Sequence, residues 1–227
     1  MSYAVVTGAS RGIGRAIAHA LADRGIDAAL LARDEKGLSE VERELRAKGT
    51  DPLVAPCDLA SETSIANAAT RCLEKKGTPR ILVHNGGIVV RNLIGETSTR
   101  DFDRVIAVNV RAPFLLTRAF LPSMVASKVG RIVAIGSISG TMGTARMTAY
   151  CASKWALTGF MKALAEEVRG TGVQALSVLP GSVDTAMLEG SGFPAAMQPE
   201  DVARLVTFAA LDAPDAMNGS VVEIFGP

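Results

Sequence analysis

Short apolar runs typical of strands alternate with helix-forming segments along the whole sequence. Strands are predicted at 3–7, 26–32, 52–57, 80–84, 131–136, 173–179 and 220–225. Helices are predicted from residue 15 after the first strand, and then at 36–48, 61–76, 100–126, 149–169 and 199–211. Strands separated by helices pair in parallel through right-handed crossovers, which place helices on both faces of the sheet. The alternation therefore predicts a doubly wound α/β fold built on a seven-stranded parallel sheet.

The composition is that of one globular domain. The 227 residues are 48% hydrophobic and 21% charged, which is enough to bury a single large core. No internal repeat, low-complexity linker or shift in composition marks a second domain. One domain over residues 1–227 is therefore expected, with a short substrate-loop insertion at about 182–198.

Charge and cysteine content argue against several classes of function. The net charge of +1 leaves no basic excess for binding nucleic acid. No apolar run approaches the roughly 18 residues of a membrane span, and no signal-peptide pattern precedes the first strand. Cys57, Cys72 and Cys151 lack metal-ligand spacing and fit thiols in a reducing compartment. A cytoplasmic protein without a metal site is therefore expected.

The first predicted strand leads into a glycine-rich turn at the start of a helix. Glycines stand at positions 8, 12 and 14 of this turn. Glycines let the backbone approach a ligand closely, and the unpaired amides of a helix N-terminus attract an anion. The position of the turn between the first strand and the first helix predicts a site for the phosphates of a dinucleotide.

Ligands of doubly wound sheets bind beyond the carboxyl ends of the strands. The residues that follow the predicted strands are therefore expected to share one site. Besides the glycine turn, these residues are Arg33, Asp58, Leu59, Asn85, Gly86, Gly87, Ser137, Pro180 and Gly181.

Tyr150 and Lys154 carry the predicted chemistry. They are four residues apart, so in a helix they project from the same face into one cleft. An ammonium close to a phenol lowers the pKa of the phenol, which suits an acid or base working near neutral pH. Ser137, after the fifth predicted strand, could polarise a substrate carbonyl. The same spacing is also common on helices without a catalytic role, so the interpretation depends on the converging site.

The end of the second predicted strand indicates which dinucleotide is bound. About 18 residues after Gly14, where NAD-binding proteins usually carry an acid for the ribose 2′-hydroxyl, the sequence has Ala32 and then Arg33. Without that carboxylate, Arg33 and Arg11 could form charge-assisted contacts to a 2′-phosphate, which favours NADP(H) over NAD(H). Asp34 leaves NAD(H) open because it could still reach a ribose, and both arginines could instead be solvated.

Together these residues resemble the short-chain dehydrogenase/reductase family over essentially the whole chain. Residues 7–14 match the family's T-G-x3-G-x-G turn, and Asn109, Ser137, Tyr150 and Lys154 match its four catalytic positions in order and spacing. The resemblance implies a Rossmann-type fold and hydride transfer between NAD(P)H and a carbonyl or an alcohol.

The resemblance also implies a role for each site residue. Tyr150 would donate the proton in reduction, and Lys154 would lower its pKa and bind the nicotinamide ribose. Ser137 would steady the substrate oxygen, and Asn109 would hold a water that connects Lys154 to solvent. The implied cofactor contacts are Gly8, Ser10, Arg11, Gly12, Ile13, Gly14, Arg33, Leu59, Asn85, Gly86, Gly87, Tyr150, Lys154, Pro180, Gly181, Val183 and Thr185, with Asp58 at the adenine ring.

One residue departs from the family pattern after the fourth predicted strand. Where the family has N-N-A-G, the sequence has His84 followed by Asn85, Gly86 and Gly87. We interpret His84 as a hydrogen-bonded core residue, because only His19 could accompany it in a metal site.

The run 136–143 is similar to bacterial 3-oxoacyl-[acyl-carrier-protein] reductases, which dock an acidic carrier protein through basic residues. Lys128 lies near one such place, whereas Thr171 occupies the other, with Arg169 two residues away. A 3-oxoacyl thioester and an acyl carrier protein therefore stay open as substrate and partner.

The sequence predicts an NADPH-dependent carbonyl reductase, with 3-oxoacyl thioesters as candidate substrates. The alternative is an NAD(P)-dependent alcohol dehydrogenase acting on a sugar, a steroid or another secondary alcohol, because the sequence does not fix the direction of the reaction. A non-catalytic dinucleotide-binding protein would be expected to have lost Ser137, Tyr150 or Lys154.

Two further segments bear on the substrate and on assembly. The 182–198 segment contains glycines and apolar residues, which suit either a mobile flap over the substrate or an ordinary surface loop. Arg146 could select an acidic substrate or face solvent.

The helix that holds Trp155 and Phe160 is apolar on more than one face, which predicts a homotetramer or homodimer.

Overall fold

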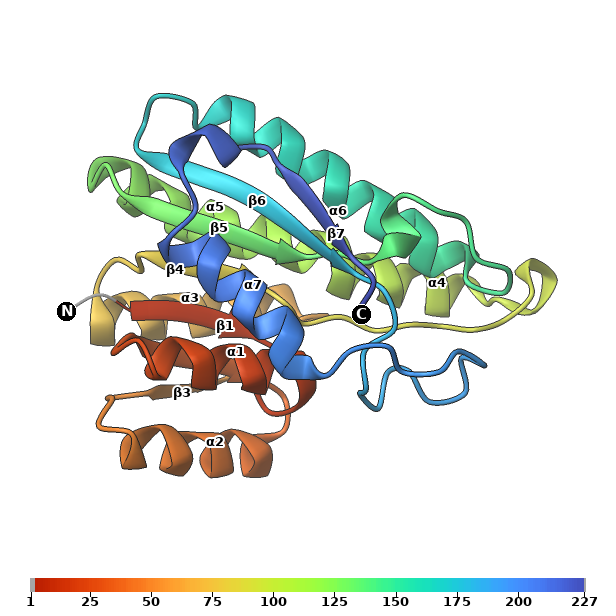
Figure 1. The fold of residues 1–227 in the computed structure, drawn as a ribbon, viewed down its shortest axis with the longest axis horizontal. Helices are drawn as coiled ribbons and strands as arrows, with labels where there is room; N and C mark the ends of the chain where they lie inside the picture. Colours follow the sequence, from red (N-terminus) through yellow and green to blue (C-terminus); the bar gives the residue numbers. More distant parts are fainter. Residues whose placement is uncertain (1–2, 227) are drawn as a thin grey trace.

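The computed structural model describes residues 3–226, which form one parallel sheet flanked by helices. Its strands are β1 (Tyr3–Thr7), β2 (Asp27–Ala32), β3 (Leu53–Pro56), β4 (Ile81–His84), β5 (Gly130–Ile135), β6 (Val173–Pro180) and β7 (Val221–Ile224). They lie in the order β3-β2-β1-β4-β5-β6-β7, and every neighbouring pair is parallel (Figure 1). The predicted seven-stranded doubly wound sheet is therefore confirmed, and each strand begins and ends within one residue of its predicted bounds.

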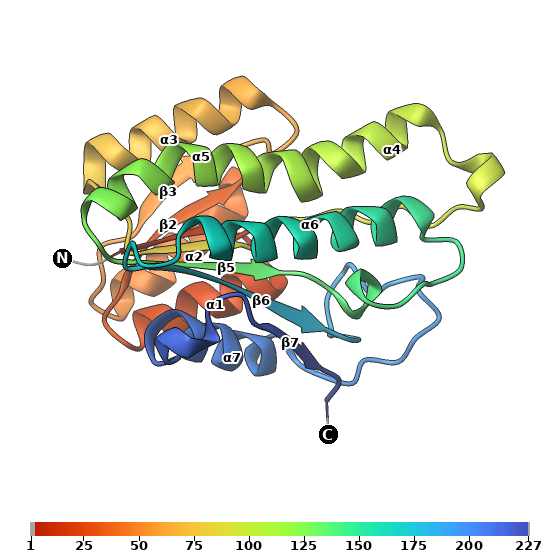
Figure 2. The same ribbon diagram turned by 90° about the horizontal axis from the view of Figure 1, so that it is seen from above.

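Helices cover both faces of the sheet, as predicted. One face carries α1 (Gly12–Ala22), α2 (Glu35–Ala47) and α7 (Pro199–Leu211), and the other carries α3 (Glu62–Lys76), α5 (Ala112–Ala126) and α6 (Thr148–Glu167). Figure 2 shows these helices above and below the sheet. Single 3-10 turns, η1 (Ile94–Glu96), η3 (Ile138–Gly140) and η4 (Asp215–Met217), lie in the connections.

The core consists of two apolar layers, one on each face of the sheet. β1, β2, β4 and β6 are wholly buried, because helices cover both of their faces, whereas the edge strands β3 and β7 are partly exposed. Side chains alternate between the layers along each strand. Val6 therefore packs on the side of α1 and α7, and its neighbour Val5 packs on the side of α3 and α5.

The long helix predicted at 100–126 was wrong in one respect, because it is interrupted. α4 (Thr99–Ile106) is followed by a π-helical turn, η2 (Ala107–Arg111), before α5 begins. Ser98 caps α4, with its Oγ accepting a hydrogen bond from the Asp101 amide at 3.1 Å. Turns of the π type inside α-helices occur frequently at functional sites. Here the turn contains Asn109, whose side chain is buried.

Within residues 3–226, one helical stretch is long and apolar enough to cross a membrane by length and composition, Thr99–Ala126. In the structure 56% of its most apolar window is buried inside the protein. Its α5 part packs against the sheet and against α3. Burial in the core therefore accounts for the apolar character of this stretch.

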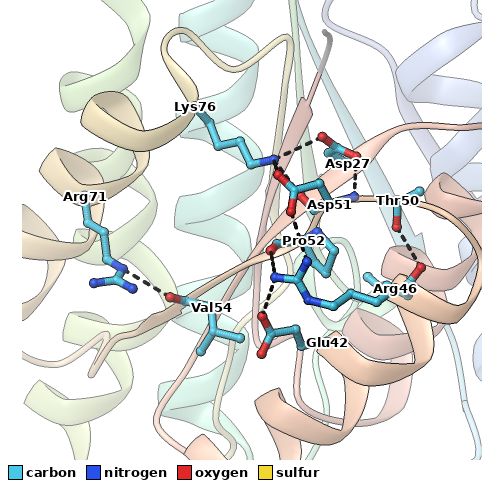
Figure 3. Close-up of polar contacts among 10 residues, drawn as sticks. Asp27, Glu42, Arg46, Thr50, Asp51, Pro52, Val54, Arg71 and Lys76 are labelled. Atoms are coloured by element: carbon cyan, nitrogen blue, oxygen red, sulfur yellow. Dashed lines mark hydrogen bonds and ion pairs between the residues drawn. The ribbon is translucent and has the colours of Figure 1, made fainter.

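An ion-pair network joins β2, β3, α2 and α3 at the amino end of the sheet (Figure 3). Lys76 Nζ donates to Asp27 Oδ2 at 3.1 Å and to Asp51 Oδ2 at 2.7 Å. Arg46 pairs with Asp51 at 3.1 Å and with Glu42 at 2.9 Å. Hydrogen bonds from Lys76 and Arg46 hold the pKa of Asp51 below its ordinary value. The network holds the edge strand β3 at the end of the sheet opposite the glycine turn.

We predict opposite effects of an added methyl group at two helical glycines. A Cβ at Gly14 would collide with the Gly8 carbonyl oxygen, whereas a Cβ at Gly159 would meet nothing within 4 Å. Gly14→Ala should lower the free energy of unfolding by about 3 kcal/mol. Gly159→Ala should raise it by about 0.5–1 kcal/mol, because alanine is the better helix former. Urea unfolding followed by circular dichroism measures both changes, and a Gly14→Ala protein as stable as the wild type would contradict the close backbone approach.

Candidate active site

A cavity of about 1650 Å³ opens at the carboxyl edge of the sheet, where the connections after the strands gather (Figure 1). Most of the predicted site residues line it: Gly8, Ser10, Arg11, Gly12, Ile13, Arg33, Asp58, Leu59, Asn85, Gly86, Gly87, Ser137, Tyr150, Lys154, Pro180, Gly181, Val183 and Thr185. Gly14 and Asn109 do not line the cavity and are buried beside it. The segments that were expected to converge therefore do so.

The glycine turn leaves the amino end of α1 free for an anion. Gly8 and Gly12 have φ angles of 67° and 55°, a region that favours glycine. Arg11, the N-cap of α1, makes no side-chain capping hydrogen bond, whereas α2, α3 and α4 each have a side-chain cap. The first amides of α1 therefore lack a capping partner and are suited to a phosphate.

The glycine turn is tied to the end of β4 by a hydroxyl and an amide. Thr7 Oγ1 donates to the Val83 carbonyl at 3.2 Å and accepts from the Asn85 and Gly86 amides, both at 2.9 Å. Asn85 Nδ2 donates to the Thr7 carbonyl at 2.9 Å. These bonds join β1 to β4 at the switch point where successive strands turn to opposite sides of the sheet.

Arg11 and Arg33 are exposed at one end of the cavity, and neither forms an ion pair among residues 3–226. Asp34, which the sequence left open as a ribose ligand, is instead the N-cap of α2, and its Oδ1 accepts from the Gly37 amide at 3.1 Å. Ala32 ends β2 without a carboxylate. Asp34, the acid that could have bound a ribose hydroxyl in place of a 2′-phosphate, therefore caps α2 instead.

Asp58 and Leu59 form the wall next to the end of β3. Asp58 Oδ1 accepts from the Ala60 amide at 3.0 Å, and within the described residues Oδ2 has no hydrogen-bond partner. Leu59 lies against Gly86, so that a Cβ at Gly86 would collide with the leucine side chain. A free carboxylate oxygen beside an apolar wall is suited to a flat heteroaromatic ring with an amino group.

α6 presents Tyr150 and Lys154 to the cavity from the same side. Both side chains are buried, and Lys154 Nζ lies 5.6 Å from the centroid of the Tyr150 ring. Lys154 Nζ donates to the Ile135 carbonyl at 2.9 Å, which fixes the ammonium at the end of β5. Ser137, two residues further along, lies close enough to the Tyr150 phenol to affect its ionisation. A hydroxyl, a phenol and an ammonium therefore share one wall of the cavity.

The pKa of Tyr150 is raised by its surroundings, whereas the sequence predicted that it would be lowered. Burial raises the pKa of Tyr150 above its ordinary value, and this outweighs the lowering by Ser137 and by the positive charge of Arg91. Burial also lowers the pKa of Lys154 to about 8. Removing a charged group from water is costly, so in this protein burial favours the neutral form of both side chains. The prediction of a lowered pKa for Tyr150 is therefore wrong, because burial leaves it above its ordinary value.

Asn109 holds the loop after β4 against α6. Its Oδ1 accepts from the Ile88 amide at 2.9 Å, and its Nδ2 donates to the Ile88 carbonyl and to Ser153 Oγ, each at 2.9 Å. Gly87 lies between Asn109 and Lys154, since a Cβ there would be 3.3 Å from Asn109 Oδ1 and 3.7 Å from Lys154 Nζ. Both hydrogens of the side-chain amide are used in these bonds. Asn109 therefore fixes the loop that contains Gly87 and Ile88 next to Lys154.

His84 lies in the core, in agreement with its interpretation as a structural residue. Its Nε2 is 2.9 Å from Thr117 Oγ1, and burial lowers the pKa of the imidazole to about 3, so the ring is neutral at physiological pH. Among residues 3–226, no group of three or more His, Cys, Asp or Glu side chains is arranged to hold a metal ion.

The segment after β6 forms the outer wall of the cavity. Val183 pairs with Met197 in an isolated parallel bridge, which closes the residues between them into a loop. Met187 and Phe193 of this loop line the cavity and remain exposed. A Cβ at Gly12 would lie 3.3 Å from Thr185 Cγ2, so the glycine turn and the start of the loop face each other closely.

Sequence reasoning missed two arginines that line the cavity, Arg91 and Arg104. Arg91 lies in the irregular connection after β4, which has no periodic pattern, and Arg104 lies on the exposed side of α4. The signal that could have identified Arg91 is its place just beyond the apolar Ile88 and Val89 at the carboxyl end of a strand. Arg146, which the sequence did identify, also lines the cavity.

Comparison with known proteins places the chain in a family. Residues 2–192 match the family model for short chain dehydrogenase. The chain is 40% identical over 186 residues to an NADPH-dependent pterin aldehyde reductase of Arabidopsis thaliana, covering 81% of this chain and 76% of that protein. It is 33% identical to a 3-oxoacyl-[acyl-carrier-protein] reductase of Pseudomonas aeruginosa, covering 98% of this chain and 95% of that protein.

Solved structures show the same relationship. A metagenomic short-chain oxidoreductase in complex with NADP superimposes with a TM-score of 0.87 at 38% identity, over 100% of this chain and 97% of the other. A protein of Beutenbergia cavernae, provisionally assigned as an NAD(P)-dependent gluconate 5-dehydrogenase and solved with bound NADP, gives a TM-score of 0.90 at 34% identity, over 98% and 94%. The chain therefore belongs to the short-chain dehydrogenase/reductase family of NAD(P)-dependent oxidoreductases.

Proposed function

We propose that this protein reduces a carbonyl compound to an alcohol with NADPH, and that Tyr150 donates the proton. The observation that carries the proposal is that Tyr150, Lys154 and Ser137 share one wall of the cavity whose other end holds the glycine turn and Arg33. One cavity thus contains both the proposed phosphate site and the proposed proton donor. The NADPH-dependent aldehyde reductase among the relatives supports reduction as the direction.

The residues around the glycine turn fit NADP(H). The uncapped amides of α1 suit the phosphates, and a side chain at Gly8 or Gly14 would collide with the neighbouring backbone, so this form of the turn requires glycine there. Arg11 and Arg33 are free to bind a 2′-phosphate. The two related structures that contain NADP support the same choice. When bound, the cofactor supplies the hydride, and NAD(H) is retained as a weaker ligand.

The burial of Tyr150 is suited to a proton donor. A phenol whose pKa lies above its ordinary value is protonated at neutral pH and can donate a hydrogen bond to a carbonyl oxygen. As negative charge develops on that oxygen, the proton of Tyr150 moves to it. Ser137 would donate a second hydrogen bond to the same oxygen, and Lys154 would bind the nicotinamide ribose and stabilise the phenolate that remains.

Asn109 completes the proposed group of four by positioning its neighbours. Its bonds to Ile88 and Ser153 fix the loop beside Lys154. The water-mediated link from Lys154 to solvent that the family resemblance implies remains part of this proposal. It would return a proton to Tyr150 after each turnover.

Two classes of substrate are candidates within the family. A 3-oxoacyl thioester is supported by the similarity to 3-oxoacyl-[acyl-carrier-protein] reductases. An acyl carrier protein as partner has less support, because Arg169 forms an ion pair with Glu166 at 2.6 Å and Thr171 offers no charge. Oxidation of a secondary alcohol such as a sugar acid is the second candidate, favoured by the similarity to the Beutenbergia cavernae protein.

We also propose that residues 1–227 form one domain that assembles in the cytoplasm as a homotetramer or homodimer. α4 and α5 follow one another end to end on one face of the molecule, and α6 runs alongside them (Figure 2). Phe102, Phe114 and Trp155 on these helices are 42%, 45% and 54% exposed. Large apolar side chains that remain uncovered on neighbouring helices are typical of an interface between subunits.

Tyr150→Phe removes only the phenolic hydroxyl and tests the proton donor. We expect kcat for carbonyl reduction to fall by about 100-fold or more, because general acid catalysis is worth about 10² to 10⁴ in rate. NADPH affinity should be nearly unchanged. The loss of NADPH absorbance with ketones, aldehydes and 3-oxoacyl thioesters measures turnover, and a fluorescence titration measures binding. Residual activity above about one hundredth of wild type would contradict this role for Tyr150.

Arg33→Ala tests the cofactor preference. We expect the Kd for NADPH to rise by about 10- to 100-fold, the usual value of a charge-assisted hydrogen bond, with little change for NADH. Arg43→Ala is the matched control, because Arg43 is exposed on α2 and does not line the cavity. Calorimetric titration with each dinucleotide gives both constants. Equal affinities of the wild-type protein for NADPH and NADH would remove the basis for the preference.

A further inference from the structure

Five arginines line the cavity: Arg11, Arg33, Arg91, Arg104 and Arg146. In the part of the chain that the structure describes, twelve ion pairs form and none of them involves these five residues. Arg11 and Arg33 lie at the glycine turn, where the proposed cofactor accounts for them. Arg91, Arg104 and Arg146 belong to segments around Tyr150, and no proposed cofactor contact accounts for these three.

Arg91 is the member of this group that is best placed to bind a ligand. Its Nη2 donates to the Met187 carbonyl at 2.5 Å, so the side chain is held between the connection after β4 and the loop after β6. Its Nε is buried and, within residues 3–226, has no hydrogen-bond partner. A buried cationic donor without a partner is costly, and an incoming acceptor would remove that cost.

The position of Arg91 relative to the reaction centre is also informative. Its positive charge is close enough to lower the pKa of Tyr150, although burial of the phenol has the larger effect. Arg104 and Arg146 line the same cavity, and Arg146 has a left-handed φ of 65°, which is unusual for a residue other than glycine. The acids that line the cavity are Asp34, Asp58 and Asp184, against the five arginines and Lys154. The lining of the cavity therefore carries a positive excess.

A purely structural role for Arg91 does not explain these contacts. Holding the loop after β6 requires one donor, and the Met187 carbonyl uses only Nη2. The unused Nε and the absence of a neighbouring carboxylate within 4 Å in the described residues instead fit a site that receives its counter-charge from a ligand.

We propose that Arg91 binds an anionic group, a carboxylate or a phosphate, on the carbonyl substrate whose oxygen faces Tyr150. Arg104 and Arg146 add positive potential at the mouth of the same site. This inference rests on the proposed function and defines its substrate class as small aldehydes or ketones that carry a negative charge. It makes Arg91 a specificity-determining residue and leaves the proton transfer to Tyr150.

The kinetic test compares matched charged and neutral substrates. The 2-, 3- and 4-carboxybenzaldehydes and their methyl esters present the same aldehyde with and without a charge at three distances. 3-Formylphenyl phosphate and 3-methoxybenzaldehyde form the corresponding phosphate pair. We expect the wild-type protein to prefer at least one acid over its ester, and the ratio of their kcat/KM values to fall by about 10- to 100-fold in Arg91→Met. The pair with the larger ratio identifies carboxylate or phosphate as the preferred anion.

Two further variants separate binding from folding. Arg100→Met is the matched control, because Arg100 is exposed on α4 and does not line the cavity, and it should keep the wild-type ratio. Arg91→Lys keeps the charge but loses the guanidinium fork, so it should retain part of the preference for the acid. This variant also gives a result if Arg91→Met does not fold. An acid-to-ester ratio that is the same in wild type, Arg91→Met and Arg91→Lys would overturn the proposal.

A binding measurement distinguishes failure of this inference from failure of the proposed function. Calorimetry measures the Kd of 3-(hydroxymethyl)benzoate and of its methyl ester with and without NADP⁺. Tighter binding of the acid that is lost in Arg91→Met supports the anion site even if no carbonyl is reduced, in which case only the proposed function fails. Reduction of neutral aldehydes without any preference for the acid in binding or turnover supports the function and overturns this inference. If neither turnover nor preferential binding of the acid is observed, both the proposed function and this inference are overturned.

Discussion

The close approach of β1 and β4 is the constraint on which the rest of the structure depends. The Thr7 hydroxyl and the Asn85 amide join the ends of these two strands, and the glycine turn passes against them without space for a Cβ at Gly8 or Gly14. Because β2 and β3 lie on one side of this point and β5 to β7 on the other, a cavity opens where the two halves diverge. Most residues of the proposed site line this cavity because they follow a strand that ends there, and α6 adds Tyr150 and Lys154.

Burial has a larger effect than charge on the ionisation of the site. Lys154 donates to a backbone carbonyl and lies beside the Tyr150 ring, yet its own pKa is lowered to about 8, and the pKa of the phenol is raised by burial. The phenol is thus kept protonated until a substrate oxygen needs a proton. Arg91, whose charge lowers the pKa of Tyr150, connects this chemistry to recognition of the substrate. A negative substrate group on Arg91 would partly neutralise that charge and further favour the protonated phenol.

Much of this architecture could be predicted from the sequence, because the strands are continuous apolar runs bounded by glycines and polar residues. The same alternation predicts that the residues after β1, β4 and β5 share one site, because parallel strands end at the same edge of the sheet. The π turn at Asn109 could not be predicted, because the packing of Asn109 against Ile88 and Ser153 stabilises it. The direction of the change in the pKa of Tyr150 depends on how much of the protein covers the phenol. Arg91 was missed because its connection has no periodic pattern.

The central claim is that burial raises the pKa of the Tyr150 phenol above its ordinary value, so that the phenol is protonated at neutral pH. An alkaline titration of the cofactor-free protein, followed by tyrosinate absorbance, tests it most directly. Tyr3 is the only other tyrosine of the chain, and burial raises its pKa as well, so the difference between wild type and Tyr150→Phe isolates one phenol. We predict that this difference appears only above about pH 10, the ordinary tyrosine value. Ionisation of Tyr150 below about pH 10 would contradict the claim.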